Sequence, residues 1–102
     1  MSKRQAVTAT AYDKSGRVIS IGRNSYINTH PLQAKYARKS GNPDAIYIHA
    51  ELDAIIRARG KPIHRIFVSR YGNDGHHAMA KPCKACQLAI RDFNIKHVEW
   101  TE

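Results

Sequence analysis

Two cysteines in the stretch KPCKACQ (residues 81–87) are the residues of this chain best suited to chemistry. Pro82 is typical of the first turn of a helix, so Cys83 and Cys86, three residues apart, are expected on one helix face. The partial positive charge of a helix N-terminus and the neighbouring lysines favour thiolate over thiol. Because cysteines so close in sequence make a poor disulfide framework, the pair predicts a metal or redox site.

Two thiolates and one imidazole would give zinc three protein ligands and leave a fourth position for water. The chain has six histidines: His30, His49, His64, His76, His77 and His97. His76 and His77 precede the cysteines by a few residues, and either could join them in a closed structural site. His49 stands apart because Glu51 accompanies it at the start of a second expected helix. If both helices begin at one pocket, His49 and the two cysteines can share a metal ion.

The spacing of His49 and Glu51 is unusual for a pair of metal ligands. In the middle of a helix, side chains two residues apart point in different directions. At the first turn, however, the pocket lies beyond the helix end, and both side chains can reach it. His49 can then bind the metal while Glu51 exchanges a proton with a metal-bound water without being a ligand.

The pattern of apolar and polar residues predicts an α/β domain in which helices connect strands. The predicted strands are residues 5–12, 17–22, 64–70 and 96–101, and the predicted helices are residues 48–59 and 82–93. Residues 31–40 are an optional helix in the first long loop. The first two strands form a hairpin, and residues 71–80 form an exposed loop. Helical connections of this length indicate parallel pairing after the hairpin. The expected product is a small α/β sandwich.

Composition limits the classes of protein to which the chain can belong. Its 102 residues suit one domain, residues 1–102, and the formal charge of +9 indicates an anionic partner. No apolar run reaches 18 residues, so no membrane span is expected. The N-terminal residues 1–10 contain no apolar signal segment, which favours the cytoplasm. A small core and an unprotected last strand indicate a homo-oligomer.

H-x-E followed by P-C-x-x-C is the signature of zinc-dependent base deaminases. The stretches HAELDAI (49–55), SIGRNSY (20–26) and AKPCKACQLAIRDFNIKHVEW (80–100) resemble the cytidine deaminase-like superfamily. The resemblance is closest to deoxycytidylate deaminase and to small phage-type members, and it covers about residues 5–101.

This resemblance implies a fold and an activity. The fold is a three-layer sandwich with a mixed sheet of four to five strands and helices on both faces. Zinc is the cofactor, held by His49, Cys83 and Cys86, while Glu51 carries protons. By the same resemblance, the Ala50 amide holds the base and Asn24 contacts the sugar. The implied activity is hydrolytic conversion of cytosine to uracil in a nucleotide or nucleoside, nominally deoxycytidylate.

Two other functions are compatible with the same residues. The net charge favours a deaminase that acts on a base within RNA or single-stranded DNA, because a basic groove follows a polyphosphate backbone. A non-catalytic, zinc-stabilised nucleic-acid-binding module is the alternative from another class. Arg23, Arg70 and Lys81 lie near expected strand or helix ends at the pocket and are candidate phosphate ligands.

Overall fold

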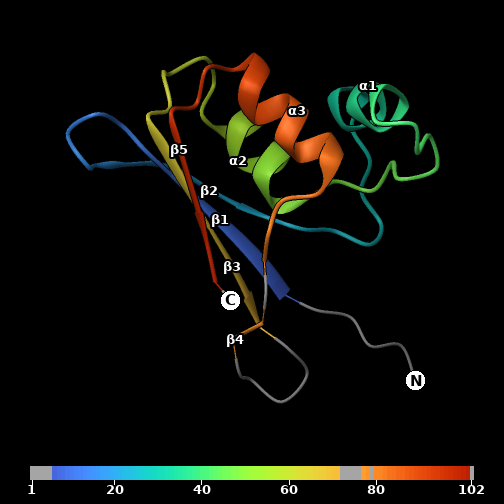
Figure 1. Ribbon diagram of the computed structural model, residues 1–102, viewed down its shortest axis with the longest axis horizontal. Coiled ribbons are helices and arrows are strands. Elements are labelled where there is room, and N and C mark those ends of the chain that lie inside the picture. Colours follow the sequence, from blue (N-terminus) through green and yellow to red (C-terminus); the bar gives the residue numbers. More distant parts are fainter. Residues whose placement is uncertain (1–5, 72–76, 79, 102) are drawn as a thin grey trace.

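The computed structural model describes residues 6–71, 77–78 and 80–101, and its elements follow the order ββααββαβ (Figure 1). The strands are β1 (Ala6–Tyr12), β2 (Val18–Arg23), β3 (Arg65–Tyr71), β4 (His77–Ala78) and β5 (His97–Trp100). The helices are α1 (Pro31–Lys39), α2 (Ala50–Arg57) and α3 (Lys84–Asp92). The predicted elements are confirmed to within a few residues at their ends. The short strand β4 lies in the segment predicted to be a loop.

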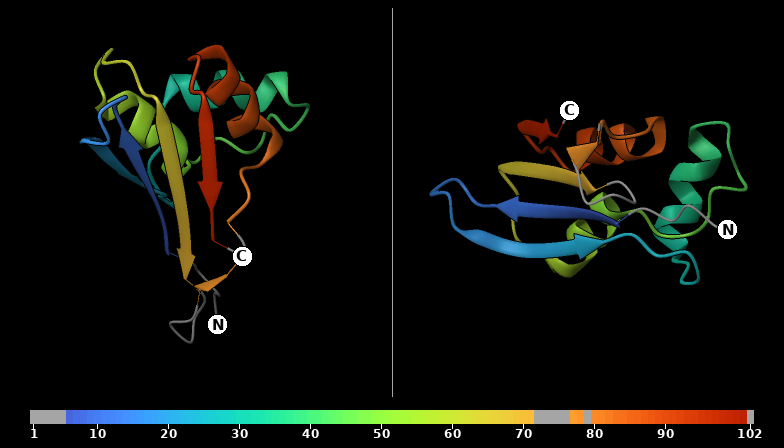
Figure 2. Two further views of the ribbon diagram at one scale, coloured as in Figure 1. Left: turned by 60° about the vertical axis from the view of Figure 1, so that its left-hand side comes forward. Right: turned by 90° about the horizontal axis from the view of Figure 1, so that it is seen from below.

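The strands form one mixed sheet in the order β2–β1–β3, with β4 and β5 also paired to β3. β1 is antiparallel to both of its neighbours, whereas β3 and β5 pair in parallel with Ile66 opposite Val98. β2, β3 and β5 therefore run in the same direction, with β1 inserted between β2 and β3 (Figure 2). The predicted parallel pairing is confirmed for β3 and β5, but β3 joins the hairpin in antiparallel orientation.

All three described helices lie on one face of the sheet (Figures 1 and 2). The expectation of a three-layer sandwich with helices on both faces is therefore wrong for the part of the chain that the structure describes. The strand residues account for this arrangement. Ala9 and Ala11 of β1 are fully buried beneath the helices, whereas Thr8 and Thr10 alternate with them on the opposite face. The described fold is a two-layer α/β sandwich.

α2 packs on the sheet at unusually short range because small residues face each other there. A Cβ atom on Gly22 of β2 would collide with the carbonyl oxygen of Ala50 and the nitrogen of Ala54. The buried hydroxyl of Ser20 donates a hydrogen bond to the Ala54 carbonyl oxygen at 2.7 Å. The N-terminal half of α2 is thus held directly by the main chain and short side chains of β2.

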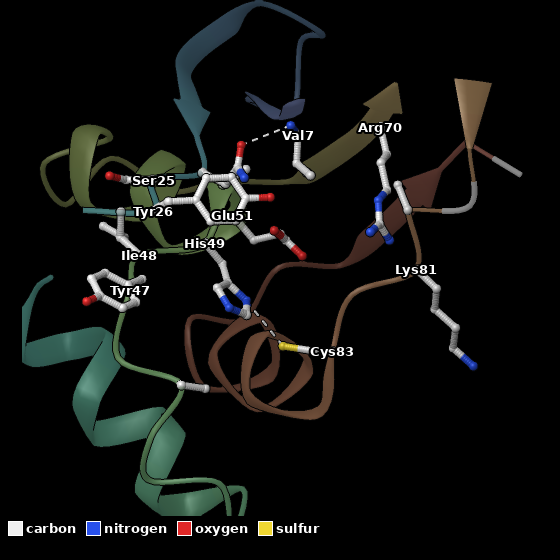
Figure 3. Close-up of a pocket in the computed structure, with 14 residues that line it drawn as sticks. Val7, Ser25, Tyr26, Tyr47, Ile48, His49, Glu51, Arg70, Lys81 and Cys83 are labelled. Carbon is white, nitrogen blue, oxygen red and sulfur yellow. Dashed lines mark hydrogen bonds between the residues drawn. The ribbon is translucent and has the colours of Figure 1, made fainter. Parts of the chain in front are cut away.

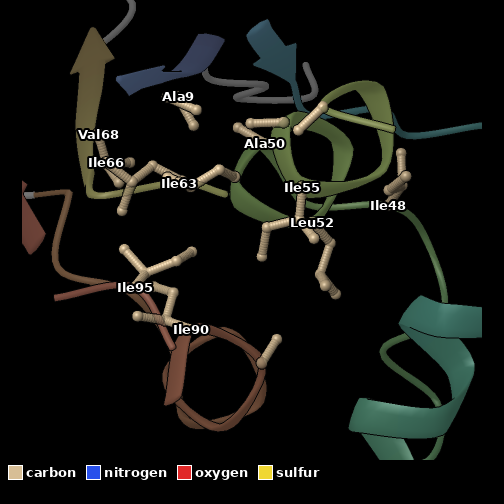
Figure 4. Close-up of a cluster of buried hydrophobic side chains, with 14 of the residues drawn as sticks. Ala9, Ile48, Ala50, Leu52, Ile55, Ile63, Ile66, Val68, Ile90 and Ile95 are labelled. Atoms are coloured by element: carbon tan, nitrogen blue, oxygen red, sulfur yellow. The ribbon is translucent and has the colours of Figure 1, made fainter. Parts of the chain in front are cut away.

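Branched aliphatic side chains fill the space between the sheet, α2 and α3 (Figure 4). Ile66 and Val68 of β3 face this core, Leu52 and Ile55 enter it from α2, and Ile90 enters from α3. α1 packs beyond α3, where the hydroxyl of the buried Tyr36 donates to a carboxylate oxygen of Asp92 at 2.9 Å. No helix in the described parts of the chain has the length and apolar character needed to span a bilayer.

Candidate metal and catalytic site

The three predicted metal ligands come together where α2 and α3 begin. His49 is the N-cap residue of α2, in extended conformation, and its side chain makes no capping hydrogen bond. Its ring instead points toward Cys83 (Figure 3), with Nδ1 3.4 Å from Sγ of Cys83 and 3.3 Å from Sγ of Cys86. The three ligand atoms all lie within 4.8 Å of one another. The convergence predicted from the two motifs is confirmed.

The donor set and its geometry suit a zinc ion. Tetrahedral zinc with ordinary Zn–S and Zn–N bond lengths places neighbouring sulfur and nitrogen ligands about 3.5 Å apart. The two sulfur-to-nitrogen distances at His49 lie close to this value. Cys83 is exposed and Cys86 is buried, so the site has one side toward the core and one side toward solvent. These residues could hold zinc through three protein ligands.

The side chains of His49, Cys83 and Cys86 shift one another's pKa values. A hydrogen bond from Cys86 lowers the pKa of Cys83 to about 4, and His49 contributes in the same direction. That hydrogen bond and burial raise the pKa of Cys86. The hydrogen bond to Cys83 raises the pKa of His49, although burial opposes it. Of the two thiols, Cys83 therefore loses its proton more readily.

Glu51 is a buried carboxyl group next to this set. Only 5% of the residue is exposed, and it lies in the first turn of α2 with its carboxyl group turned into the pocket (Figure 3). Burial raises its pKa above the ordinary value for glutamate. A carboxyl group whose pKa is raised holds a proton more readily than an ordinary glutamate, which suits it to take up and release a proton during a reaction.

The site opens into a pocket of about 380 Å³. Its wall is built by two loops whose main chains are hydrogen bonded: the Ser25 N–H donates to the Ile48 carbonyl oxygen, and the Ile48 N–H donates to the Asn28 carbonyl oxygen, both at 3.0 Å. A β-bridge between Thr29 and Tyr47 extends the contact. The lining residues include Val7, Asn24, Ser25, Tyr26, Tyr47, Ile48, His49, Ala50, Glu51, Arg70, Lys81 and Cys83.

Both predicted substrate contacts, Asn24 and Ala50, line the pocket, and their roles stay predictions. The Asn24 side-chain oxygen accepts a hydrogen bond from the Val7 N–H at 3.0 Å, which fixes the orientation of the amide. Ala50 is the first residue of α2, where a main-chain N–H has no acceptor within the helix.

Two of the three candidate phosphate ligands line the pocket, namely Arg70 at the end of β3 and Lys81 before α3. In Figure 3 they lie on the opposite side of His49 from Tyr47. Arg23 is not among the lining residues; its N–H binds a carboxylate oxygen of Asp53 at 2.9 Å. The pocket therefore has a cationic side close to the metal ligands.

The other histidines have separate places in the fold. His30 caps α1, with Nδ1 accepting from the Leu32 N–H. His64 and His97 contact each other edge to face, 4.9 Å between ring centroids, near the starts of β3 and β5 and far from the pocket. His76 lies outside the described residues, and so does the side chain of His77. The alternative in which His76 or His77 joins the cysteines in a closed structural site is therefore not tested by the described residues.

One residue of this region gave no functional signal in the sequence. Gln33 of α1 is fully buried, and its side chain accepts a hydrogen bond from the His49 N–H at 3.1 Å. It belongs to a helix that the sequence predicts only as an optional element of a long loop. Its contact with His49 spans 16 residues and leaves no mark in local periodicity.

Comparison with known sequences does not assign the chain to a family. No protein-family model matches the chain, and no curated protein matches it. The resemblance of the two motifs to the deaminase superfamily therefore stays a prediction. What supports a function is the set of residues gathered in the pocket, namely a possible metal-binding group beside a buried carboxyl group.

Proposed function

We propose that the protein is a zinc-dependent hydrolytic deaminase that converts cytosine to uracil in a nucleotide or nucleoside, nominally deoxycytidylate. One observation carries the proposal. His49, Cys83 and Cys86 form a three-ligand group at the same pocket that holds the buried Glu51. A structural zinc site has no use for a buried carboxyl group that is not a ligand, whereas hydrolysis requires a group that transfers protons.

The proposed division of roles follows the positions of the side chains. Bound zinc would supply a water molecule acidified enough to act as a nucleophile near neutral pH. Glu51 takes a proton from the attacking water and delivers it to the ring nitrogen of the base. It then assists proton transfer to the departing amino group, so that oxygen from water replaces the amine at C4 and ammonia leaves. Ala50 holds the base through its N–H.

The pocket also supports the choice of a nucleotide over a free nucleoside. Arg70 and Lys81 both line it, and a guanidinium or ammonium group is a favourable partner for phosphate. Its volume of about 380 Å³ falls within the range typical of small-molecule sites. The formal charge of +9 favours the second candidate, deamination of a base within RNA or single-stranded DNA.

An ammonia-release screen separates these substrates. Purified protein is assayed with cytosine and adenine as free bases, nucleosides, 5′-nucleotides and single-stranded oligonucleotides. Deoxycytidylate is expected to be converted with the highest kcat/KM. In Arg70→Met, KM should rise for the nucleotide while the nucleoside reaction stays unchanged. If only the oligonucleotides are converted, the second candidate, a deaminase that acts on a base within RNA or single-stranded DNA, is supported.

The zinc content of the wild-type protein, measured together with its activity, tests the alternative that the protein is a non-catalytic nucleic-acid-binding module. About one zinc ion per chain is expected. Zinc binding and salt-sensitive nucleic-acid binding, with no ammonia released from any substrate, would replace the enzyme with a nucleic-acid-binding module. Wild-type protein purified without zinc, and unable to take it up, would contradict both readings.

A further inference from the structure

Gln33 is a buried polar side chain that the proposed chemistry does not use. It lies on α1 and has no exposed surface, although its primary amide carries both donors and an acceptor. Burying such a group without hydrogen bonds costs free energy. The partners that Gln33 finds therefore indicate what its burial achieves.

Both partners belong to the segment that leads into α2. Nε2 of Gln33 donates to the carbonyl oxygen of Ala45 at 3.2 Å, and Oε1 accepts from the N–H of His49 at 3.1 Å. Ala45 and His49 both line the pocket. One buried amide thus holds both ends of the segment 45–49, which includes the predicted histidine ligand.

We infer that Gln33 is a positioning residue for the metal centre, because it fixes the main chain of His49 at the place from which Nδ1 reaches both sulfurs. As the N-cap residue, His49 lies at the boundary of α2, where its N–H is outside the helical hydrogen-bond ladder. Its imidazole makes no capping bond that would steady it locally. The inference rests on the proposed function only in taking His49, Cys83 and Cys86 as ligands.

α1 connects this support to the helix that carries the cysteines. Tyr36, one turn after Gln33, donates its hydroxyl hydrogen to Asp92 of α3, and Lys39 lies 3.7 Å from the same carboxylate oxygen. Because residues three apart lie on the same face of a helix, one face of α1 contacts both α3 and the main chain of His49. Through these contacts α1 sets the distance between the histidine ligand and the two thiol ligands.

Gln33→Met tests the inference, because methionine keeps the length and approximate volume of the side chain and removes both hydrogen bonds. The matched control is Ser20→Ala, which removes another buried hydrogen bond, from Ser20 to the Ala54 carbonyl of α2. Hydrogen bonds that orient metal ligands typically contribute 10- to 100-fold to metal affinity. Gln33→Met is expected to weaken zinc binding by about this factor, whereas Ser20→Ala leaves it unchanged.

Two readouts report on the metal without requiring activity. Competition with a chromophoric chelator gives the Kd for zinc, and substitution with Co²⁺ gives thiolate-to-metal and ligand-field bands that report the geometry around the ion. Gln33→Met is expected to weaken zinc binding and change the Co²⁺ bands. If Gln33→Met and Ser20→Ala lose similar stability but both keep wild-type zinc affinity and Co²⁺ spectra, Gln33 has only a structural role.

Two further variants keep the test decisive. Gln33→Glu retains an acceptor for the His49 N–H, and it should bind zinc more tightly than Gln33→Met; equal affinities would contradict the inference. If Gln33→Met does not fold, Gln33→Asn, which withdraws the amide by one methylene, carries the same expected loss. Wild-type protein that binds no zinc would refute the proposed function itself, so the two failures are distinguishable.

Discussion

The N-termini of α2 and α3 meet at the same pocket, but they are held in place differently. The start of α2 lies directly on the sheet, where Gly22 leaves no room for a side chain beneath Ala50 and Ala54. α3 packs mainly against α1 and α2. It is held by apolar side chains such as Ile90 and by the hydrogen bond between Asp92 and Tyr36 of α1.

This difference corresponds to the roles proposed for the two helices. α2 carries Glu51, whose position relative to a substrate must be accurate to transfer a proton. α3 carries the two thiols, which a bound metal ion would itself draw into position. A rigid support for α2 and a more adaptable one for α3 would suit these roles. Four variants, in order of decreasing expected effect, test the comparison.

Replacing the proton carrier of α2 should have the largest effect. Glu51→Gln is expected to lower kcat of the proposed deamination by about 10²- to 10⁴-fold, the usual contribution of a general acid–base group. Zinc content should stay at the wild-type level because Glu51 is not a ligand. The control is Glu99→Gln, which alters an exposed carboxylate paired with Arg65 at 2.8 Å. Wild-type kcat in Glu51→Gln would remove the proton-transfer role.

Replacing a thiol of α3 should instead act through the metal. A ligand present at about a thousand times its Kd stabilises the folded state by about 4 kcal/mol, so chelation is expected to lower the wild-type Tm by more than about 10 °C. Cys86→Ser should abolish both zinc uptake and this chelator-dependent shift. Lys84→Ala, which changes an exposed residue between the two cysteines, should retain both. Undiminished zinc in Cys86→Ser would contradict the ligand set.

Adding a methyl group at Gly22, beneath α2, tests whether α2 is held rigidly on the sheet. Gly22→Ala places a Cβ atom against the main chain of Ala50 and Ala54, and overpacking of this kind typically costs about 1–3 kcal/mol. Denaturant unfolding measures the loss. Ile21→Ala, at the neighbouring position where 49% of the residue is exposed, should cost less than about 1 kcal/mol. Similar stabilities for the two variants would show that α2 is free to shift.

Removing the hydrogen bond from Tyr36 to Asp92, which anchors α3, should have the smallest effect. Its contribution to the free energy of unfolding should depend on pH. Burial and the Asp92 hydrogen bond raise the pKa of Tyr36 to about 12, from about 10 in an unfolded chain. Because the folded-state pKa is the higher one, the stabilisation is complete below pH 10 and is lost as the pH rises toward 12. Between pH 9 and 11.5, the wild type should therefore lose about 1–2 kcal/mol more unfolding free energy than Tyr36→Phe. Parallel pH profiles for the two proteins would contradict this.

Local sequence signals predicted the elements of this fold well. Pro31 and Pro82 precede or open the two helices that they predict, and Gly60 takes the left-handed conformation, with φ of 84°, after α2. The meeting of His49 with the cysteines was also predictable, because both motifs stand at helix starts. Such signals depend on neighbours in the chain, which the sequence contains directly.

Features that depend on distant partners were harder to predict. The alternation in residues 5–12 indicates a half-buried strand, and β1 confirms it, whereas helices on both faces came from the resemblance and are wrong for the described residues. Gln33 could not be recognised because its function depends on partners 12 and 16 residues away. An isolated glutamine in an amphipathic helix looks the same whether it binds water or a main-chain group.

The two loops that form the pocket wall are joined through main-chain groups of Ser25, Asn28 and Ile48. These main-chain contacts do not involve the side chains of Tyr26 and Tyr47. Tyr26 and Tyr47 both line the pocket and remain 43% and 48% exposed. These two positions can be varied together in a library to change which ligand is accepted, while the main-chain contacts beside the proposed metal ligands are retained.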